Sequence, residues 1–546
     1  MQFSVHEMGL HPELQSAGAR PTLRQMPRAR LLVLPALLLI AVLLAACGGA
    51  GGASDADPAK AVPAGAAIYI EGVVRPEGDQ RDDVLDAARK VLRTDDPEAK
   101  LHELIDKGLQ DSDGPATSYD KDIAPWLGQK AGVWVAGVDR AKPGYVVLVA
   151  AKDTEKAQEA LDKSAKQEKK AVKERSYKDV DYQVDSDGVA AGIVGDFLTV
   201  GTEPELKRTV AAEDGDSLAD EKRFKNTIDD LDDDRIGSFY VDLKPFIEQA
   251  VKSDPKAGAQ LEQIRSIFPI DKLVPMSGAL LADGDRIAFD TIMKGSGVKS
   301  LGAFSPFLGT GSTPLIAELP GDSWAAYGAP NVGPGLKSLF TRMAGAFGGA
   351  AATQQLQQQY GIDLERDVFG WIGDMGLFVR GSDKASLEGG LVIQATNADN
   401  MRNAFGKIVG LIQSQGGKKA SPVKVKGAAA AFSLGPTGEL GKPVILARSD
   451  DRVVVGVGEA ATADALAPAS KLGDSELYGQ AKDRLDGVEP TLLLSMPALV
   501  KAVDASGDTD DDWQKAKPYL EAFTVLASGG SLEDDELESR AVAGLK

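Results

Sequence analysis

The chain has 546 residues and a formal net charge of −20 at pH 7, and 43% of its residues are hydrophobic. This length is too great for one typical core and indicates two or more domains. The acidity excludes a surface suited to nucleic acid. Because the chain has one cysteine, it can form no internal disulfide. After Cys47 it has a single histidine, which excludes zinc sites built from His and Cys there.

Residues 1–46 have the pattern of a secretion signal. The basic residues Arg28 and Arg30 precede the apolar run 31–44, which is shorter than the ~20 residues that a membrane-spanning helix needs. Acidic residues lie upstream of this basic cluster, within residues 1–25, where a signal peptide rarely has them. We therefore expect translation to start at Met26.

The sequence Leu44-Ala45-Ala46-Cys47 resembles the lipobox of bacterial lipoproteins. The resemblance implies cleavage before Cys47, diacylglycerol on its thiol and acylation of the new N-terminus, which together make membrane anchoring durable. It also implies a location on the extracytoplasmic side of the bacterial cell membrane. The alternative is a buried cysteine at the end of an uncleaved apolar segment. Residues 47–61 are small and polar, which predicts a flexible tether after the lipidated cysteine.

Residues 62–294 mix helices and strands. Pro97–Leu109 places its leucines largely on one helical face, Val146–Ala151 is a continuous apolar strand, and Asp153 caps a second helix. Gly195-Asp196 separates two strands, and Asp283-Gly284-Asp285 joins another two. Links this short favour antiparallel pairing.

Residues 313–546 repeat the blocks of residues 62–294 in the same order. The offsets between matched blocks are similar, which argues for duplication. Residues 295–312, rich in Gly, Ser and Pro, are the predicted linker between two domains. The matched blocks are 62–65 with 319–322, 122–128 with 367–373, 132–136 with 376–379, 146–150 with 391–395, 197–201 with 452–456, 238–245 with 492–497, and 277–295 with 528–545.

The predicted fold class is therefore α+β, in two tandem repeated domains. Each domain is expected to have an antiparallel-rich sheet with helices packed on one face. In the second domain, Thr396 and Asn397 are the capping candidates for the helix that carries Met401, Ala404 and Phe405.

The opening Val62-Pro63-Ala64-Gly65-Ala66 after a lipobox, together with Gly361-Ile362-Asp363-Leu364 before Trp371-Ile372-Gly373, resembles domain of unknown function family 3352 of bacterial envelope proteins. The resemblance would cover nearly the whole chain after Cys47. It implies location and architecture, and it provides no activity or functional residue. The first half departs from the pattern before Trp126.

No catalytic constellation stands out. His102 is the only histidine after Cys47 and is expected to be a solvated helix residue rather than a catalytic base. Ser253, Ser296 and Ser421 each begin a Ser-x-x-Lys sequence, but the companion motifs of penicillin-recognising enzymes are missing, so these are expected to be surface coincidences.

Two acidic runs, 229–234 and 504–512, invite a calcium-site hypothesis, but neither has the spacing of a calcium loop, and solvated loops are the preferred interpretation. Trp126 and Trp371, at matched positions, are predicted to be core anchors rather than a ligand platform. The small-residue stretch Gly345–Ala352 could form an apolar groove or close helix packing, and packing is preferred.

These observations predict a membrane-anchored extracytoplasmic lipoprotein that binds or scaffolds an envelope partner without catalysis. Its contact with the membrane would be the anchor at Cys47, and no cofactor, metal or nucleic acid is expected. One alternative is a carrier of a lipid or other apolar ligand, with residues 345–352 lining an internal cavity. The other is a cell-wall-active hydrolase that uses two carboxylates.

Overall fold

The computed structural model describes residues 56–111, 118–137, 144–167, 172–253, 270–302, 309–347, 361–414, 420–436, 440–507 and 509–546, together with residues 258, 261, 265, 353–354 and 357–358. The predicted signal peptide, Cys47 and most of the tether lie outside the described residues. Lipidation of Cys47 and the start at Met26 therefore stay predictions.

The strands fall into two sets, one from each predicted half of the chain. The first half contributes β1 Ile68–Val73, β2 Leu127–Gly137, β3 Gly144–Ala151, β4 Lys173–Tyr177, β5 Val180–Val184, β6 Val189–Val194, β7 Phe197–Thr202, β8 Gly237–Val241, β9 Met276–Asp283 and β10 Arg286–Lys294. The second half contributes β11 Ala325–Ala329, β12 Ile372–Arg380, β13 Glu388–Ala395, β14 Ser421–Pro422, β15 Ala430–Pro436, β16 Pro443–Arg448, β17 Arg452–Val457, β18 Leu492–Ser495, β19 Phe523–Glu533 and β20 Glu536–Leu545.

Helices connect these strands in both halves. The α-helices are α2 Gly78–Leu92, α3 Pro97–Asp111, α4 Thr154–Gln167, α5 Glu203–Glu213, α6 Lys222–Ile228, α7 Leu243–Ser253, α9 Pro314–Ala317, α10 Val332–Phe347, α12 Ala398–Ser414, α13 Glu459–Leu466, α14 Glu476–Arg484, α15 Met496–Ser506 and α16 Asp511–Leu520. Short 3-10 or π turns are η4 Pro58–Ala61, η5 Tyr119–Ile123, η6 Leu218–Asp220, η7 Ile270–Lys272, η8 Val298–Leu301, η10 Glu365–Phe369 and η11 Leu472–Asp474.

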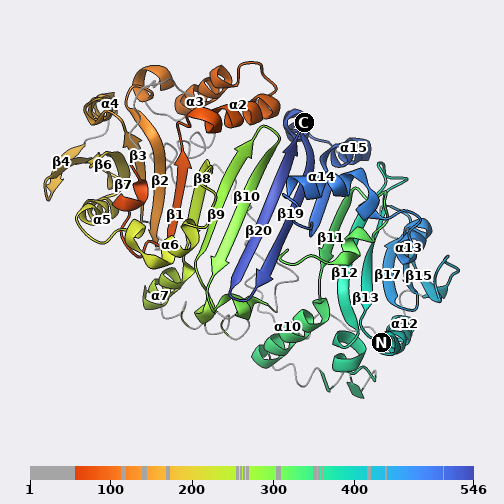
Figure 1. Ribbon diagram of the computed structural model, residues 1–546. Coiled ribbons are helices and arrows are strands. Elements are labelled where there is room, and N and C mark those ends of the chain that lie inside the picture. The colour runs from red at the N-terminus through yellow and green to blue at the C-terminus, as the bar shows by residue number, and fades with distance from the viewer. Residues whose placement is uncertain are drawn as a thin grey trace, which may run out of the picture.

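The described strands form one sheet in which every pair is antiparallel. In the first half, pairing runs in the order β4, β5, β6, β7, β3, β2, β1, β8, β9 and β10. In the second half it runs in the order β14, β15, β16, β17, β13, β12, β11, β18, β19 and β20. The two series meet because β10 pairs with β20. Figure 1 shows β9, β10, β20 and β19 side by side in the middle of the molecule.

The mixed helix and strand class and the antiparallel sheet agree with the sequence prediction. The sequence suggested a separate sheet in each half, whereas the sheet here is continuous across both. The physical reason is that β10 and β20 would each be an edge strand with unpaired backbone groups, and pairing satisfies both edges. The domain boundaries remain predictions, although Val298 and Leu301 of the expected linker are buried.

Local predictions from capping and hairpin patterns are confirmed. The helix expected from Pro97 is α3, and the Asp153 carboxylate accepts the Lys156 backbone N–H at 3.0 Å at the start of α4. Asn397 does the same for Asn400 at 2.9 Å before α12. The two short links become the hairpins β6–β7 and β9–β10.

One face of the sheet is covered along both halves. There, Tyr69, Trp134 and Tyr240 pack against η4 and α6 in the first half. In the second half, Phe378, Val392 and related residues pack against α9, α13 and α14. Leu281 of β9 contacts both clusters, so the covered face has a continuous core.

The outer edges of the sheet are protected from further pairing. At one end lies β4, in which four of five residues are exposed and Lys173, Glu174 and Arg175 supply charge. At the other end lies β14, which has only two residues. Short or charged edge strands resist edge-to-edge aggregation.

Candidate functional site

The four central strands, β9, β10, β20 and β19, have two faces of opposite character. Successive residues along a strand point to opposite faces of the sheet, and directly paired residues of neighbouring strands share a face. One face has eight charged residues: Asp283, Arg286, Asp290, Lys294, Glu533, Glu536, Glu538 and Arg540.

The other face of these four strands has no charged residue, and we call it the apolar floor. Of its positions, Gly278 and Leu537 are buried, and the rest are partly or fully exposed. The apolar floor consists of Met276, Gly278, Leu280, Ala282, Ile287, Phe289, Thr291, Met293, Leu526, Ser528, Gly530, Leu532, Leu537, Ser539, Ala541 and Ala543.

A single row of directly opposed residues crosses the floor and continues into the second half. Directly opposed residues of an antiparallel pair share a face, so their side chains lie next to one another. Within the row, Phe289, Leu492 and Leu377 keep 42%, 38% and 46% of their surface exposed. The row consists of Phe289, Ala541, Ser528, Leu492, Tyr327 and Leu377.

Toward the first half, aromatic stacking extends the floor. The rings of Phe239 on β8 and Phe289 on β10 stack with centroids 5.5 Å apart and planes 9° apart. Gly278 lies between them on β9, and a Cβ at that position would be 2.2 Å from the Phe239 ring. Glycine is therefore required for the stack. Ile70, opposite Phe239 on β1, is 36% exposed.

Helices also cover the face of the floor, on either side of it, so the prediction that helices pack on one face of the sheet is wrong. The physical reason is that strands such as β3, in which residues 145–151 are all buried, are apolar on both faces. In the first half, Ile105 and Leu109 of α3 and Ala157 of α4 pack over β2 and β3. In the second half, Val332 of α10 and Phe405 of α12 belong to the cluster that covers β12 and β13. The apolar floor thus lies between two covered regions of one sheet face.

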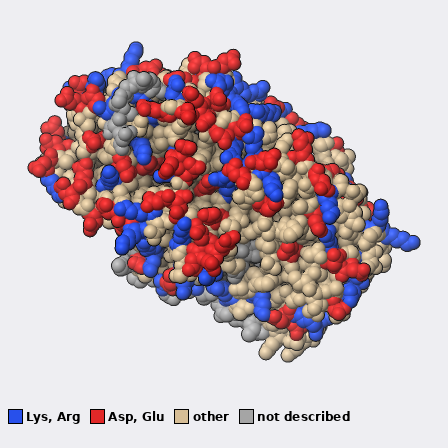
Figure 2. Space-filling model, viewed as in Figure 1, with Lys and Arg blue, Asp and Glu red and all other residues tan. Residues whose placement is uncertain are grey.

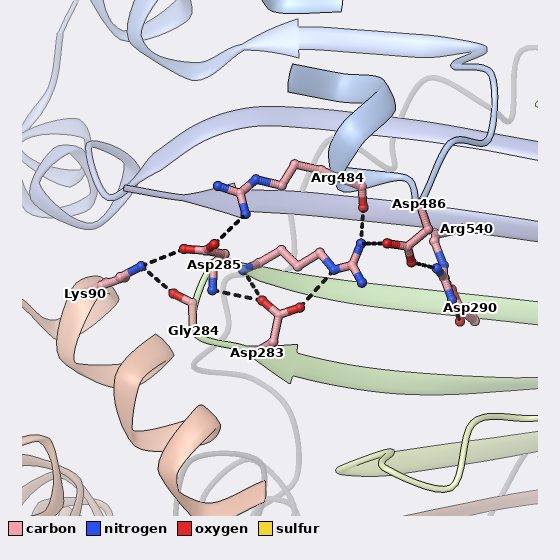
Figure 3. A network of polar contacts seen from close by, with 9 residues as sticks. Lys90, Asp283, Gly284, Asp285, Asp290, Arg484, Asp486 and Arg540 are labelled. Atoms are coloured by element: carbon pink, nitrogen blue, oxygen red, sulfur yellow. Dashed lines mark hydrogen bonds and ion pairs between the residues drawn. The ribbon is translucent and has the colours of Figure 1, made fainter. Parts of the chain in front are cut away.

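On the charged face, ion pairs join the halves (Figure 3). Arg540 of β20 donates two hydrogen bonds to Asp290 of β10, at 2.7 and 2.6 Å, and also pairs with Asp486. Arg286 donates to Asp486 at 2.7 Å and to Asp283 at 3.0 Å. These contacts place charge-assisted hydrogen bonds directly across the β10–β20 seam.

The same network continues to α2. The Asp285 carboxylate contacts Arg484 at 3.2 Å and Lys90 at 3.4 Å. Hydrogen bonding to Arg484, followed by Lys90, lowers the pKa of Asp285, and hydrogen bonding to Asp290 raises the pKa of Arg540. Because opposite charges are matched within the network, its arrangement is that of a structural joint between halves.

The described cavities are lined by polar and charged groups. One of about 280 Å³ lies by β1, β2 and β8, with Glu71, Arg75 and Lys130 in its wall. Another is surrounded by acidic residues of the β19–β20 turn, including Glu536 and Glu538. Burial, followed by the hydrogen bond that the protonated Glu538 carboxyl donates to Glu536, raises the pKa of Glu538.

Trp126 and Trp371 lie in equivalent surroundings. Both side chains are buried, and their indole N–H groups donate to the Asp122 carbonyl at 2.7 Å and the Asp367 carbonyl at 3.0 Å. Each belongs to a core cluster. The prediction that they are core anchors is confirmed.

His102 differs from the solvated residue expected from sequence. Its side chain is only 20% exposed, its Nδ1 lies 3.2 Å from the Asp120 carboxylate, and its ring packs on Tyr119 with centroids 4.5 Å apart. The apolar face of α3 is wider than its leucines indicated, because η5 packs beside it. Ser296 and Ser421 lie on the surface as expected, and the Ser253 side chain is outside the described residues.

Where the structure describes the two acidic runs, their aspartates are exposed to solvent or accept hydrogen bonds from nearby residues. All five aspartates of 229–234 are exposed, which agrees with the solvated-loop interpretation. Asp510 caps α16, and Asp504 accepts from Trp513 and Lys517. Among the described residues, no group of three His, Cys, Asp or Glu side chains is arranged to hold a metal ion. Of the stretch Gly345–Ala352, residues 348–352 lie outside the described part of the chain.

Sequence reasoning missed the apolar floor. Its signal is present in β10, where Ile287, Phe289 and Met293 alternate with Ala288 and Ile292. Both faces of the strand therefore have apolar residues, and a period-two pattern alone does not say which face helices cover.

These features define a class: a mixed α and β protein with one continuous antiparallel sheet, two outer regions covered by helices and an uncharged central face. Residues 95–488 match the family described as "Protein of unknown function (DUF3352)". The chain belongs to this family.

Comparison with solved structures and with curated proteins identifies no function. Solved structures of TP0453 overlap with 44% of this chain: crystal form III at 13% identity, 80% of its own length and a TM-score of 0.23, and crystal form IV at 12%, 81% and 0.24. Overlap this low says nothing about function. No curated protein matches the chain. Within the described residues, no helix has both the length and the apolar character needed to cross a bilayer.

Proposed function

We propose that this protein is a membrane-anchored, extracytoplasmic binding protein of the bacterial envelope, without catalytic activity, and that the apolar floor is its binding surface. The observation that carries the proposal is a charge-free sheet face, shared by strands of both halves, on which Phe289 is 42% exposed. Contiguous exposed apolar surface in a folded protein commonly marks a site of interaction.

We also propose that the two halves are copies of one ancestral unit. The order of pairing from edge to centre is the same in both halves, and each of β1 to β10 has its counterpart among β11 to β20. The pairing register also agrees. Ile70 of β1 lies opposite Phe239 of β8 in the first half, and Tyr327 of β11 lies opposite Leu492 of β18 at the corresponding position of the second half. Duplication of one unit explains why the floor has strands from both halves, since each half contributes only part of it.

The anchor part of the proposal depends on sequence. Cys47 ends a lipobox-like run, and residues 48–55 then lead to η4, which is packed against the folded body. A lipid on Cys47 would hold the body close to the membrane surface.

In-cell photocrosslinking tests the binding surface. A photoreactive amino acid replaces Phe289 or Leu492 on the floor row in the full-length chain, and Val488 or Tyr519 in matched controls. Val488 is 38% exposed and lies next to Gly529, on the face opposite the floor, and Tyr519 is 49% exposed and lies on α16, outside the strands of the floor.

We expect discrete adducts, of protein or of lipid, from positions 289 and 492, and none from the control positions. Equal labelling at all four positions, or no adduct at either floor position, would overturn the proposed binding surface. Either type of adduct supports binding.

A carboxylate hydrolase is the alternative with one observation in its favour. Glu536 and Glu538, two residues apart on one face of β20, both line the second cavity, and the raised pKa of Glu538 is a property that general acids use. Glu538→Gln would abolish such an activity on cell-wall polymers, and activity unchanged by this substitution would remove the alternative.

A further inference from the structure

The apolar floor offers its occupant almost only non-directional contact. Each of its central strands, β10 and β20, is paired on both sides, so their backbone groups are used within the sheet. The hydroxyls of Thr291 and Ser539 lie 2.8 Å apart and bond to each other. We infer, building on the proposed function, that the occupant is a hydrocarbon: the acyl chains of a membrane lipid.

The scarcity of polar groups on the floor favours a lipid over a protein. A stable protein interface needs about one hydrogen bond per 100–200 Å². The sixteen floor positions offer only the hydroxyls of Thr291, Ser528 and Ser539, two of which bond to each other, whereas an acyl chain requires no hydrogen bond.

The charge distribution also favours a lipid over a peptide. The chain has a net charge of −20, yet the sixteen floor positions include no acidic or basic side chain. A charged peptide would find no complementary charge on the floor and would lose hydration there. Acyl chains lose nothing by leaving water, and a headgroup can remain in solvent beyond the end of the strands.

The protein's own anchor is a second source of acyl chains. However, Ala59, Ala61 and Val62, at and just after η4, pack in the same cluster as Trp134, on the sheet face opposite the floor. The chain that follows Cys47 therefore joins the folded body on the sheet face opposite the floor. We therefore assign the floor to a separate lipid molecule.

Photolabelling with a lipid probe tests this assignment. The full-length lipidated protein is reconstituted in phosphatidylglycerol vesicles containing phosphatidylethanolamine with a diazirine in one acyl chain, irradiated, digested and mapped by mass spectrometry. We expect adducts on the peptides of β10 and β20. Because a carboxylate on the floor must be desolvated against hydrocarbon, Phe289→Asp should lower their yield by at least about tenfold.

Val488→Asp is the matched control, since Val488 is 38% exposed and lies next to Gly529, on the face opposite the floor. It should leave the yield unchanged. Equal losses in both variants, or adducts spread evenly over the surface, would overturn the lipid assignment. If position-specific protein adducts form at Phe289 in cells while the lipid probe fails to label β10, the proposed binding function stands and the lipid occupant is wrong.

Occupancy of the floor by the protein's own lipid anchor would give a different result. In the vesicles only the added phosphatidylethanolamine has the diazirine, so a floor filled by the Cys47 acyl chains would leave β10 and β20 unlabelled. Removal of the anchor by cleavage at a protease site inserted within residues 48–55 would then uncover labelling. That outcome would also contradict a separate lipid.

Discussion

The two halves use the same strand order but fill their cores differently. On the covered face, the first half has Tyr69 and Tyr240, with Phe224 edge-on to each at 5.9 and 5.2 Å. At the positions that correspond by register, the second half has Ala326 and Leu493. The two tyrosines of the first half are thus replaced by the smaller side chains of Ala326 and Leu493 in the second. Strand pairing fixes the fold, while the volume of each core is free to vary.

The halves also differ in charge distribution. In Figure 2, acidic side chains crowd the upper left of the view, where Figure 1 places the first half, and become sparser toward the lower right. Conversely, beside the matched tryptophans the second half has the more deeply buried aspartate. Asp367 has a 2% exposed side chain, and Asp122, at the corresponding place, is 19% exposed.

The shared tryptophan anchor gives the largest expected effect. Trp126→Ala and Trp371→Ala should each lower the free energy of unfolding by about 3–5 kcal/mol, because each removes a buried indole and its hydrogen bond. Chemical denaturation measures this. Since both indoles are buried and donate to a matched carbonyl, the two losses should agree within about 1 kcal/mol. A loss confined to one half would break the proposed equivalence.

The buried aspartate should distinguish the halves. Asp367 accepts from Arg366 at 2.9 Å, from the Asp363 backbone at 2.8 Å and from Lys407. Asp367→Asn should cost about 3 kcal/mol, because the buried carboxylate is the shared acceptor of Arg366, Lys407 and the Asp363 backbone N–H. Asp122→Asn, at a more exposed pair with Lys163, should cost about 1 kcal/mol. Equal costs would contradict the difference in burial.

The pH dependence of the same pair has a defined sign. Hydrogen bonding, first from Arg366, holds the pKa of Asp367 well below its usual range, and hydrogen bonding from Lys163 lowers that of Asp122. A depressed pKa contributes stability above the unfolded value of about 4, and this is lost as pH falls toward the folded value. Asp367→Asn should therefore flatten the loss of stability below about pH 4.

The seam between halves should respond to charge reversal. Asp290→Arg and Arg540→Asp each place like charges opposite one another on β10 and β20 and should cost about 2 kcal/mol. The double variant restores opposite charges and should recover at least half of the summed loss. Asp290→Asn, which adds no repulsion, is the control. Additive losses in the double variant would show that the pair does not couple the halves.

The smallest effect is expected at the start of α5. Glu203 contacts Lys207 at 2.8 Å, Arg175 at 2.7 Å and the Tyr182 hydroxyl at 2.9 Å, and these hydrogen bonds, first that of Lys207, lower its pKa to about 2. Solvent screening reduces the benefit, so Glu203→Gln should cost about 1 kcal/mol at neutral pH.

This contribution is complete above the unfolded pKa of about 4.3 and disappears as pH falls through about 2. In the second half, Glu459 begins α13 at the matching place and is exposed. Glu459→Gln should change stability by less than about 0.5 kcal/mol. Unfolding curves at pH 7 and pH 3 check both variants, and a larger effect at Glu459 would reverse the comparison.

Much of the fold was predictable from local patterns. Asp153 and Asn397 cap helices because their carboxylate or amide oxygens satisfy backbone N–H groups within three residues, which sequence spacing reveals. The hairpin at Gly195-Asp196 follows from residues that tolerate a tight turn. The candidate site was not predictable in this way, since Phe289 and Ala541 lie in strands far apart in the chain and meet only by pairing.

The sequence by itself determined the element types, the series of similar blocks and the lipobox-like Cys47, because these depend on residues close together in the chain. Only the tertiary structure decided that β10 and β20 join the halves into one sheet and that Ile287 and Phe289, rather than Ala288 and Ile292, keep solvent exposure. The physical reason is that edge pairing and helix cover are long-range choices. A strand that is apolar on both faces is compatible with either face being buried, and the surrounding helices select one.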